Sequence, residues 1–321
     1  MPDMENMSPE ELKKLMAQMQ QKEYEGLTPE EIEEKKKEKE MRKRKNIALL
    51  DETIELCQKG CYERDGKTVE IGLSEEEMRE ICVFLPDEIA ALPAKAESEG
   101  QQKAAFRCEN KDALSLAQED REDPSYQSGN SGANVLVLNL ASATRPGGAS
   151  RDGANGQEED LCRKSTLLLS LETEEARRYY DYNNDLHTRL GSDGVLISPH
   201  VAVIRDAKGE LLAQPFEISV MSCSAPMVRL GLEGKSEEEY KEMLLGRIRG
   251  MLRCAGSLGY KNLVLGAFGC GVFGNDAAVV SDAFKKALDG TDGCGFEHVD
   301  FAVLCTEGKE YNYQEFCRNF G

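Results

Sequence analysis

Residues 134–169 read NVLVLNLASATRPGGASRDGANGQEEDLCRKSTLLL. The stretch begins with an unbroken apolar run, which is typical of a strand whose two faces are both covered by helices. A loop of small residues follows, and then a segment that opens with two acids and has helical character. Such a loop lets backbone N–H groups approach a ligand closely, and the start of the following helix favours an anion. The stretch therefore predicts an α/β sheet with an anion-binding loop at the carboxyl end of a strand.

The rest of residues 133–321 alternates between strand-like and helix-like segments. Apolar runs at 195–197, 201–204, 218–221, 262–268 and 299–305 predict further strands, and the segments 157–170, 172–183, 236–258 and 276–288 predict helices. This alternation indicates a three-layer α/β domain, a mixed sheet flanked by helices, which we place at residues 126–321.

A second glycine loop, Gly269-Cys270-Gly271-Val272-Phe273-Gly274-Asn275, follows the strand expected at 262–268 and precedes a helix. The pattern matches the G-x-G-x-x-G fingerprint of dinucleotide-binding domains. That fingerprint opens a domain, whereas only one predicted helix and one predicted strand follow it here, which excludes a standard NAD-dependent dehydrogenase. We expect a diphosphate-binding turn, with Phe273 either stacked on a ribose or folded back onto the core.

The N-terminal part has a different composition. Residues 1–45 predict a charged helical extension, with helix starts at Ser8-Pro9-Glu10-Glu11 and Thr28-Pro29-Glu30-Glu31. A solvated helix is the simpler interpretation, and a docking helix for an unknown partner is the alternative. Residues 46–125 predict a helical accessory region, with a hairpin at Asp65-Gly66, a strand at 103–108 and a helix at 112–118.

The composition excludes several classes of protein. The chain has 59 acids and 40 bases, a net charge of −19, which argues against a general nucleic-acid binder or a binder of anionic membranes. No apolar run approaches the roughly 18 residues that span a bilayer. Eleven cysteines without a C-x-x-C pair, and an N-terminus unlike a signal peptide, predict a cytoplasmic protein. Cys57 and Cys61 lack nearby ligands, so we predict no metal site.

The two loops together resemble the bacterial-type (microbial) poly(ADP-ribose) glycohydrolases, which are built on a macrodomain. The family motif is a glycine triplet, six to eight residues and then Gln-Glu-Glu. Here it reads Gly147-Gly148-Ala149, seven residues and Gln157-Glu158-Glu159. The segment GAFGCGVFGND (266–276) is similar to the second phosphate loop of the family. The resemblance extends from about residue 42 onward, so the first 40 residues lie outside it.

The resemblance implies a role for each matching residue. Glu159 would be the catalytic acid, and Glu158 would orient the terminal ribose that Asn139 contacts. The remaining substrate-binding residues would be Gly147, Gly148, Ala149, Gln157, Gly269, Gly271, Val272, Phe273, Gly274 and Asn275. The substrate would be poly(ADP-ribose), or ADP-ribose on modified proteins, and the reaction would use no cofactor. Ala149 departs from the third glycine, and its methyl group would cause crowding if the position needs a positive φ or touches the ligand.

The implied mechanism is glycosidic. Glu159 would protonate the leaving hydroxyl of a ribose–ribose bond and then activate a water, and a Glu beside another Glu should have a raised pKa. Three alternatives stay open at this point. They are a macrodomain that binds ADP-ribose without cleaving it, a hydrolase of single ADP-ribosyl groups, and a scaffold assembled through residues 1–60.

Overall fold

The computed structural model describes residues 24, 26–93, 104–126, 135–293 and 295–321. The expected helix start at Ser8 lies outside these residues. The helices are α2 (Pro29–Lys59), α3 (Glu75–Arg79), α4 (Pro86–Ala91), α5 (Ala113–Glu122), α6 (Gln157–Lys164), α7 (Leu167–Leu171), α8 (Glu174–Asp185), α9 (Glu237–Ser257), α10 (Ala277–Leu288) and α11 (Tyr311–Phe320). The strands are β1 (Cys61–Arg64), β2 (Lys67–Glu70), β3 (Cys82–Phe84), β4 (Ala105–Glu109), β5 (Val135–Leu140), β6 (Val195–Arg205), β7 (Leu211–Cys223), β8 (Asn262–Gly266) and β9 (His298–Ala302).

A seven-stranded mixed sheet with the order β3-β6-β7-β5-β8-β9-β4 forms the middle of the molecule. The pairs β7–β5, β5–β8, β8–β9 and β9–β4 are parallel, whereas β3–β6 and β6–β7 are antiparallel. The central strand β5 therefore lies between two parallel partners. The carboxyl ends of β7, β5 and β8 meet at one edge of the sheet, where ligand sites of α/β proteins form.

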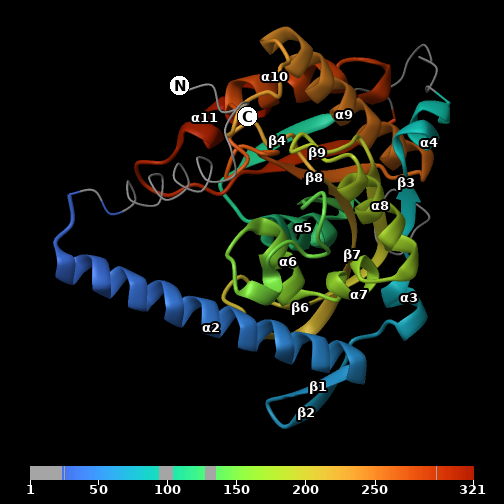
Figure 1. The fold of residues 1–321 in the computed structure, drawn as a ribbon. Coiled ribbons are helices and arrows are strands. Elements are labelled where there is room, and N and C mark those ends of the chain that lie inside the picture. The colour runs from blue at the N-terminus through green and yellow to red at the C-terminus, as the bar shows by residue number, and fades with distance from the viewer. Residues whose placement is uncertain (1–23, 25, 94–103, 127–134, 294) are drawn as a thin grey trace.

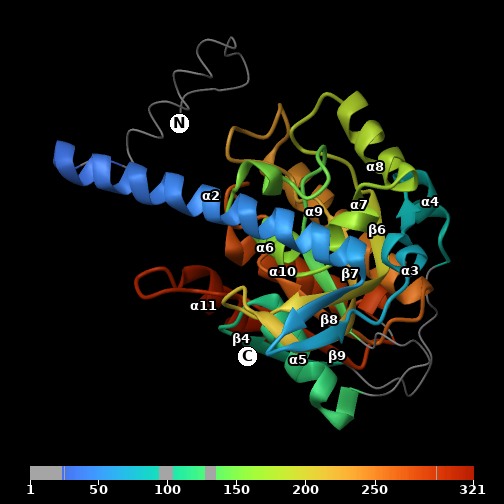
Figure 2. The same cartoon turned by 90° about the horizontal axis from the view of Figure 1, so that it is seen from below.

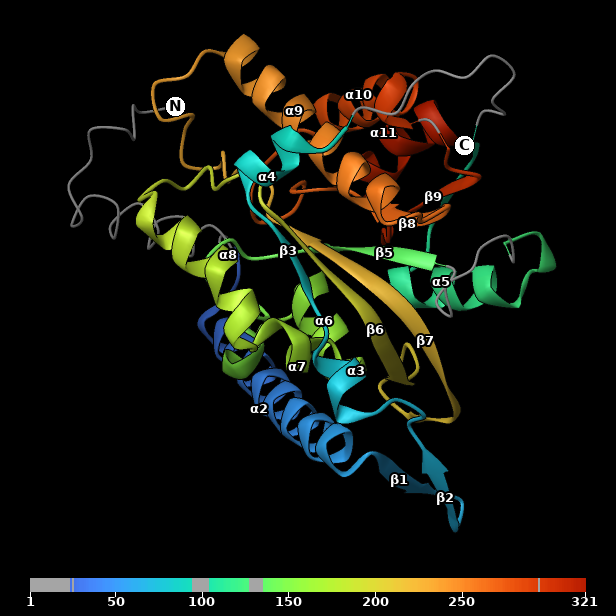
Figure 3. The same ribbon diagram turned by 90° about the vertical axis from the view of Figure 1, so that its right-hand side faces the viewer.

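Helices cover both faces of this sheet, as Figures 1 and 3 show. The side chains of β5 alternate between the two layers, with Leu136 and Leu138 in the core under α9, α10 and α11 and Val135 and Val137 in the core under α5 to α8. Successive side chains of a strand point to opposite faces, and here both faces are buried. This explains why the sequence of β5 is apolar at successive positions. The predicted three-layer α/β class is confirmed.

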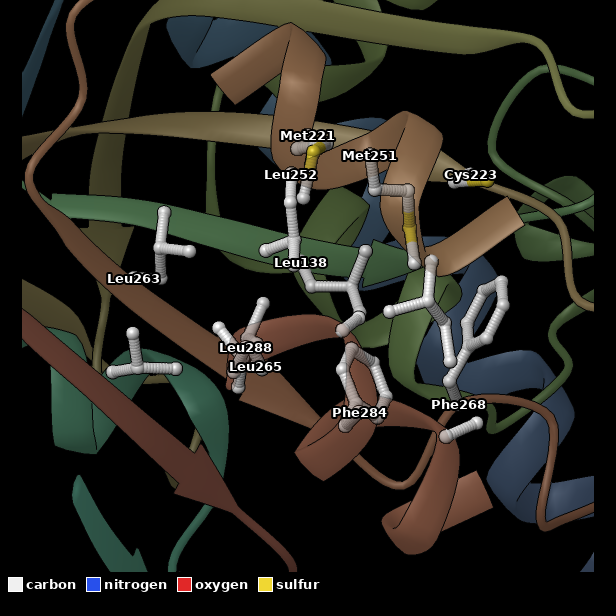
Figure 4. Close-up of a cluster of buried hydrophobic side chains, with 14 of the residues drawn as sticks. Leu138, Met221, Cys223, Met251, Leu252, Leu263, Leu265, Phe268, Phe284 and Leu288 are labelled. Atoms are coloured by element: carbon white, nitrogen blue, oxygen red, sulfur yellow. The ribbon is translucent and has the colours of Figure 1, made fainter. Parts of the chain in front are cut away.

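The core under α9 to α11 combines Leu and Met side chains with Phe rings (Figure 4). Phe284 of α10 packs edge-on against Phe301 of β9 with ring centroids 5.4 Å apart, and Phe268, just beyond β8, is fully buried. Phe268 belongs to the same core as Leu138 and Leu265. This packing fixes the chain at the point where the second glycine loop begins.

Several predicted boundaries are wrong: the strand expected at 218–221 is β7, which begins at Leu211, and the strands expected at 262–268 and 299–305 end at Gly266 and Ala302. Two further errors come from pairing between distant segments. The helix expected over 157–170 breaks after Lys164, because Ser165 bridges to Val203 of β6 and the Thr166 N–H donates to the Ala202 carbonyl oxygen at 3.0 Å. The strands expected at 195–197 and 201–204 are one strand, β6, with a register shift between Ser198 and Val201 against β7. The described residues after the second loop also include an additional helix, α11.

The N-terminal elements match their local signals. Thr28 caps α2 with a reciprocal capping box to Glu31, and α2 ends at Gly60 in the left-handed conformation. The hairpin β1–β2 turns at Asp65-Gly66 as predicted. The region expected to be a helical accessory also contributes β3 and β4, the two edge strands of the sheet, so the sheet continues across the expected boundary at residue 126. No helix in the described part of the chain is long and apolar enough to cross a membrane.

Candidate active site

The two glycine loops lie side by side, because they follow the neighbouring parallel strands β5 and β8. Between them is a cavity of about 800 Å³. Nine of the predicted site residues line it, together with parts of the backbone that the sequence did not single out. The predicted ones are Gly148, Ala149, Gln157, Glu158, Glu159, Gly269, Gly271, Val272 and Phe273.

Glu158 is buried at the bottom of this site, with 3% of its surface exposed. Its Oε2 accepts from the Ser142 N–H at 2.7 Å and its Oε1 from Asn139 Nδ2 at 3.4 Å. Burial raises the pKa of Glu158 to about 8, with neighbouring Glu159 adding to the rise and the two hydrogen bonds opposing it. At neutral pH this carboxyl is therefore mostly protonated, so it can donate a hydrogen bond to a ligand hydroxyl.

Glu159 is partly exposed to the cavity, and the first loop holds its carboxylate. The N–H of Ala149 donates to its Oε1 at 3.0 Å. A Cβ built on Gly148 would lie 2.7 Å from Oε2 of Glu158 and 2.7 Å from Oε1 of Glu159. Both carboxyl groups thus lie against Gly148, and there is no room for a side chain at this position.

Gln157 and Asn139 hold the acids in place from inside the sheet. The Gln157 side chain accepts from the Leu140 N–H and donates to the Leu138 carbonyl oxygen, both at 2.8 Å, so it docks the start of α6 on the end of β5. Asn139 is fully buried and donates to Ser222 Oγ of β7 at 2.9 Å. Both were expected to bind substrate, and the structure gives them these positioning contacts.

The second loop is shaped by a buried amide. Asn275 Nδ2 donates to the carbonyl oxygens of Pro226 at 2.8 Å and Gly269 at 3.0 Å, and its Oδ1 accepts from the Tyr240 hydroxyl at 2.8 Å. Asn275 and Gly274 do not line the cavity. Gly274 has a φ of +80°, and a side chain at this position would collide with Arg229. Asn275 therefore folds the loop and lies behind it.

Three residues of this loop face the cavity with unused backbone donors. Within the described residues, the N–H groups of Gly271, Val272 and Phe273 donate to no protein atom, while the Phe273 carbonyl oxygen accepts from the N–H groups of Val228 and Arg229 at 2.9 Å. Val272 is 76% exposed, and Phe273 packs partly against the core while lining the cavity. Unpaired amides in a glycine turn are suited to oxygen atoms of an anion.

The backbone answers the question raised by Ala149. Gly147 and Gly148 have φ values of +64° and +60°, the left-handed region that glycine favours, but Ala149 has a φ of −104°. The methyl group at position 149 therefore meets no backbone penalty. The crowding expected for a positive φ does not arise.

Sequence reasoning missed three parts of the site. Ser142 supplies the backbone donor to Glu158, Arg145 lines the cavity and pairs with Asp152 at 2.9 Å, and Ala225 comes from the loop after β7. The first two lie in the quoted loop, so their position next to the glycines was a usable signal. A second cavity of about 620 Å³ shares Leu140, Gly156 and Gly271 with the first and extends towards Asp112 at the start of α5.

The described residues contain no group of three His, Cys, Asp or Glu side chains able to hold a metal ion. Cys57 is buried in α2 and Cys61 half-buried in β1, both as free thiols. The site thus offers amides, two carboxyls and an arginine, which can bind an anionic glycoside and protonate it.

Fold and site together define a macrodomain-like hydrolase. A family model described as "Microbial-type PARG, catalytic domain" matches residues 50–206. The poly(ADP-ribose) glycohydrolase of Thermomonospora curvata is 33% identical, with a TM-score of 0.78, over 86% of this chain and 100% of that one. The same enzyme bound to the inhibitor ADP-HPD gives a TM-score of 0.76. The Deinococcus radiodurans enzyme in complex with ADP-ribose is 32% identical, with a TM-score of 0.68, over 77% and 96% of the two chains. Comparison with curated proteins finds no match.

The chain belongs to the microbial-type poly(ADP-ribose) glycohydrolase family. This membership makes it a glycosidase that acts on the linkages of ADP-ribose polymers. The resemblance seen in the two loops is thereby confirmed over most of the chain.

Proposed function

We propose that this chain releases ADP-ribose by hydrolysing ribose–ribose bonds, with Glu159 as the general acid and base. The observation that carries this assignment is the contrast between two adjacent acids. Glu158 is buried, with its pKa raised to about 8, whereas Glu159 reaches the cavity and is held by the Ala149 N–H. A buried carboxyl fixed by two hydrogen bonds suits a positioning role, whereas a carboxyl that reaches the cavity can, in its protonated form, give a proton to a leaving group.

The reaction begins with binding of the terminal ADP-ribose unit between the two loops. The free amides of Gly271, Val272 and Phe273 face the diphosphate, so the acidic chain needs no cluster of basic side chains there. Protonated Glu158 donates to a hydroxyl of the terminal ribose. The relatives that support this arrangement bind ADP-ribose or ADP-HPD.

Hydrolysis then proceeds at the anomeric carbon of that ribose. As the bond to the next unit breaks, Glu159 gives its proton to the departing hydroxyl and positive charge develops on the ribose. Glu159, now ionised, takes a proton from the attacking water, which adds to the anomeric carbon and regenerates the acid. The bond cleaved thus lies beside Glu159, and the remaining polymer departs from that side of the cavity.

Glu159→Gln tests the assignment because it keeps the shape of the side chain and removes the proton. We expect turnover of polymer to fall by at least about a hundredfold, while calorimetry gives an unchanged affinity for ADP-ribose. The wild type should release ADP-ribose from poly(ADP-ribosyl)ated protein. Equal hydrolysis by the variant would remove Glu159 from the mechanism, and tight binding without any release by the wild type would make the chain a reader.

A further inference from the structure

The N-terminal half of α2 carries the densest run of positive charge in the sequence. Residues 35–45, KKKEKEMRKRK, contain eight bases and two acids in a chain with a net charge of −19. Nearly every side chain of this segment is exposed, and this half of the helix extends beyond the rest of the molecule (Figure 2). Neither the catalytic assignment nor the fold accounts for this charge.

The orientation of the helix sorts these bases into two faces. Asn46 of α2 points at the first catalytic loop, where its Nδ2 donates to the carbonyl oxygens of Gly153 at 3.1 Å and Ala154 at 3.3 Å. With 3.6 residues per turn, the side of the helix that carries Asn46 also carries five bases, together with Ile32 and Glu38. We call these five bases the basic stripe: Lys35, Lys36, Lys39, Arg42 and Lys43.

The opposite face of the helix is neutralised. Lys37 pairs with Glu33 at 4.0 Å and Arg44 with Glu40 at 3.2 Å, both at i, i+4 spacing. By contrast, Arg42 and Lys43 form no ion pair with any residue that the structure describes. The charges of Arg42 and Lys43 therefore lie on the face that, one turn later, contacts the catalytic loop.

This face begins at the wall of the catalytic cavity. The backbone oxygen of Lys43 lies so close to Gly153 that a Cβ there would be 2.5 Å from it. The next residue, Ala154, lines the cavity together with Gly156, whose own Cβ position would be 2.2 Å from Glu159 Oε2. Residues 153–156 thus run from the backbone of α2 at Lys43 to the carboxylate of Glu159.

We propose that the basic stripe binds the part of an ADP-ribose polymer that lies beyond the cleaved bond. This inference rests on the proposed function, because the departing polymer must leave the cavity beside Glu159. Each unit of that polymer carries a diphosphate, and the acidic body of the protein repels it, whereas the stripe attracts it. The family match begins at residue 50, so the stripe is a feature of this chain outside the matched part.

Two variants with the same change in charge test the proposal. Arg42→Gln/Lys43→Gln removes two charges from the stripe, and Lys37→Gln/Arg44→Gln removes two from the neutralised face of the same helix. We expect only the first to raise KM for long polymer, on the order of tenfold at low salt, and to lower the salt slope of polymer binding by about 1. Calorimetry with free ADP-ribose, which has no unit beyond a cleaved bond, should give wild-type values for both variants.

The outcomes separate the stripe from the active site. Failure of the wild type to cleave any polymer would contradict the proposed function, whereas equal KM values for all three proteins would contradict the stripe alone. An equal rise in KM in both variants would mean that only the net charge of the helix matters, and it would overturn the proposal. In the Glu159→Gln background, tighter binding of single-stranded RNA than of polymer with the same number of phosphates would assign the stripe to nucleic acid instead.

Discussion

Adjacent positions in the first loop differ in what they tolerate. Gly148 has a φ of +60° and lies against both carboxylates, whereas Ala149 has a φ of −104°. We expect Gly148→Ala to cost about 1–2 kcal/mol for the left-handed conformation alone. By pushing the acids aside it should also lower polymer hydrolysis on the order of a hundredfold. Thermal unfolding and ADP-ribose release measure the two effects.

The neighbouring substitution Ala149→Gly serves as the control. It relieves no strain, so we expect wild-type hydrolysis and a loss of stability of about 0.5–1 kcal/mol from the added freedom of the unfolded chain. A clear gain of activity in this variant would show that the methyl group at position 149 obstructs the ligand. That result would contradict the backbone argument.

Glu158 gives the stability of the protein a distinctive pH dependence. Its pKa is about 8 in the folded state against 4.5 for the ordinary side chain, so the folded protein binds the proton more tightly than the unfolded chain. The stabilisation by this group is complete below pH 4.5 and is lost as the pH rises through 8. The free energy of unfolding of the wild type should therefore fall, relative to Glu158→Gln, by on the order of 3 kcal/mol between pH 5 and 8.

Urea unfolding at several pH values measures this difference, because Gln keeps an acceptor for the Ser142 N–H and has no proton to lose. Parallel stability curves for the two proteins would mean that Glu158 is ionised throughout that range. The neutral donor role assigned to it would then be wrong.

At the scale of elements, the second loop depends on a side chain behind it. Asn275→Ala leaves the carbonyl oxygens of Pro226 and Gly269 and the Tyr240 hydroxyl without their partner. We expect a loss of about 3 kcal/mol in stability and weaker ADP-ribose binding, because the free amides of the loop lose their alignment. Thermal unfolding and calorimetry test this, with the exposed Val272→Ala as the control in the same loop. Unchanged affinity in Asn275→Ala would show that the loop holds its shape without the amide.

Elements with local signals could be predicted from the sequence, and those that depend on distant partners could not. Thr28, Ser74 and Ser236 each form a capping box at the start of a helix. The predicted strand–loop–helix order around both glycine loops is confirmed. The break at Ser165 could not be predicted, because it arises from pairing with Val203 of β6. The roles of the loop residues divide in the same way. A glycine motif predicts a loop that binds an anion. Only the folded chain shows that the side-chain amides of Gln157 and Asn275 form hydrogen bonds with backbone groups.

At the scale of the whole molecule, α2 divides into a part outside the body and a part inside it. Leu50 and Cys57 are buried, and Thr53 donates to the Arg163 carbonyl oxygen at 2.7 Å while accepting from Arg205 at 2.9 Å. The segment 29–45 contains no buried residue. The expected division of the chain at residue 45 therefore makes a prediction about stability.

Removal of residues 1–45 should lower the unfolding temperature by no more than about 3 °C, because the residues of this segment that the structure describes, 24 and 26–45, include no buried side chain. Removal of residues 1–59 exposes the surface under Leu50 and leaves Arg205 in the core without Thr53, so we expect a fall of at least about 10 °C. Scanning calorimetry of the two truncated proteins measures both shifts. A large fall after the shorter truncation would show that the extension is part of the folded body, and the division at residue 45 would be wrong.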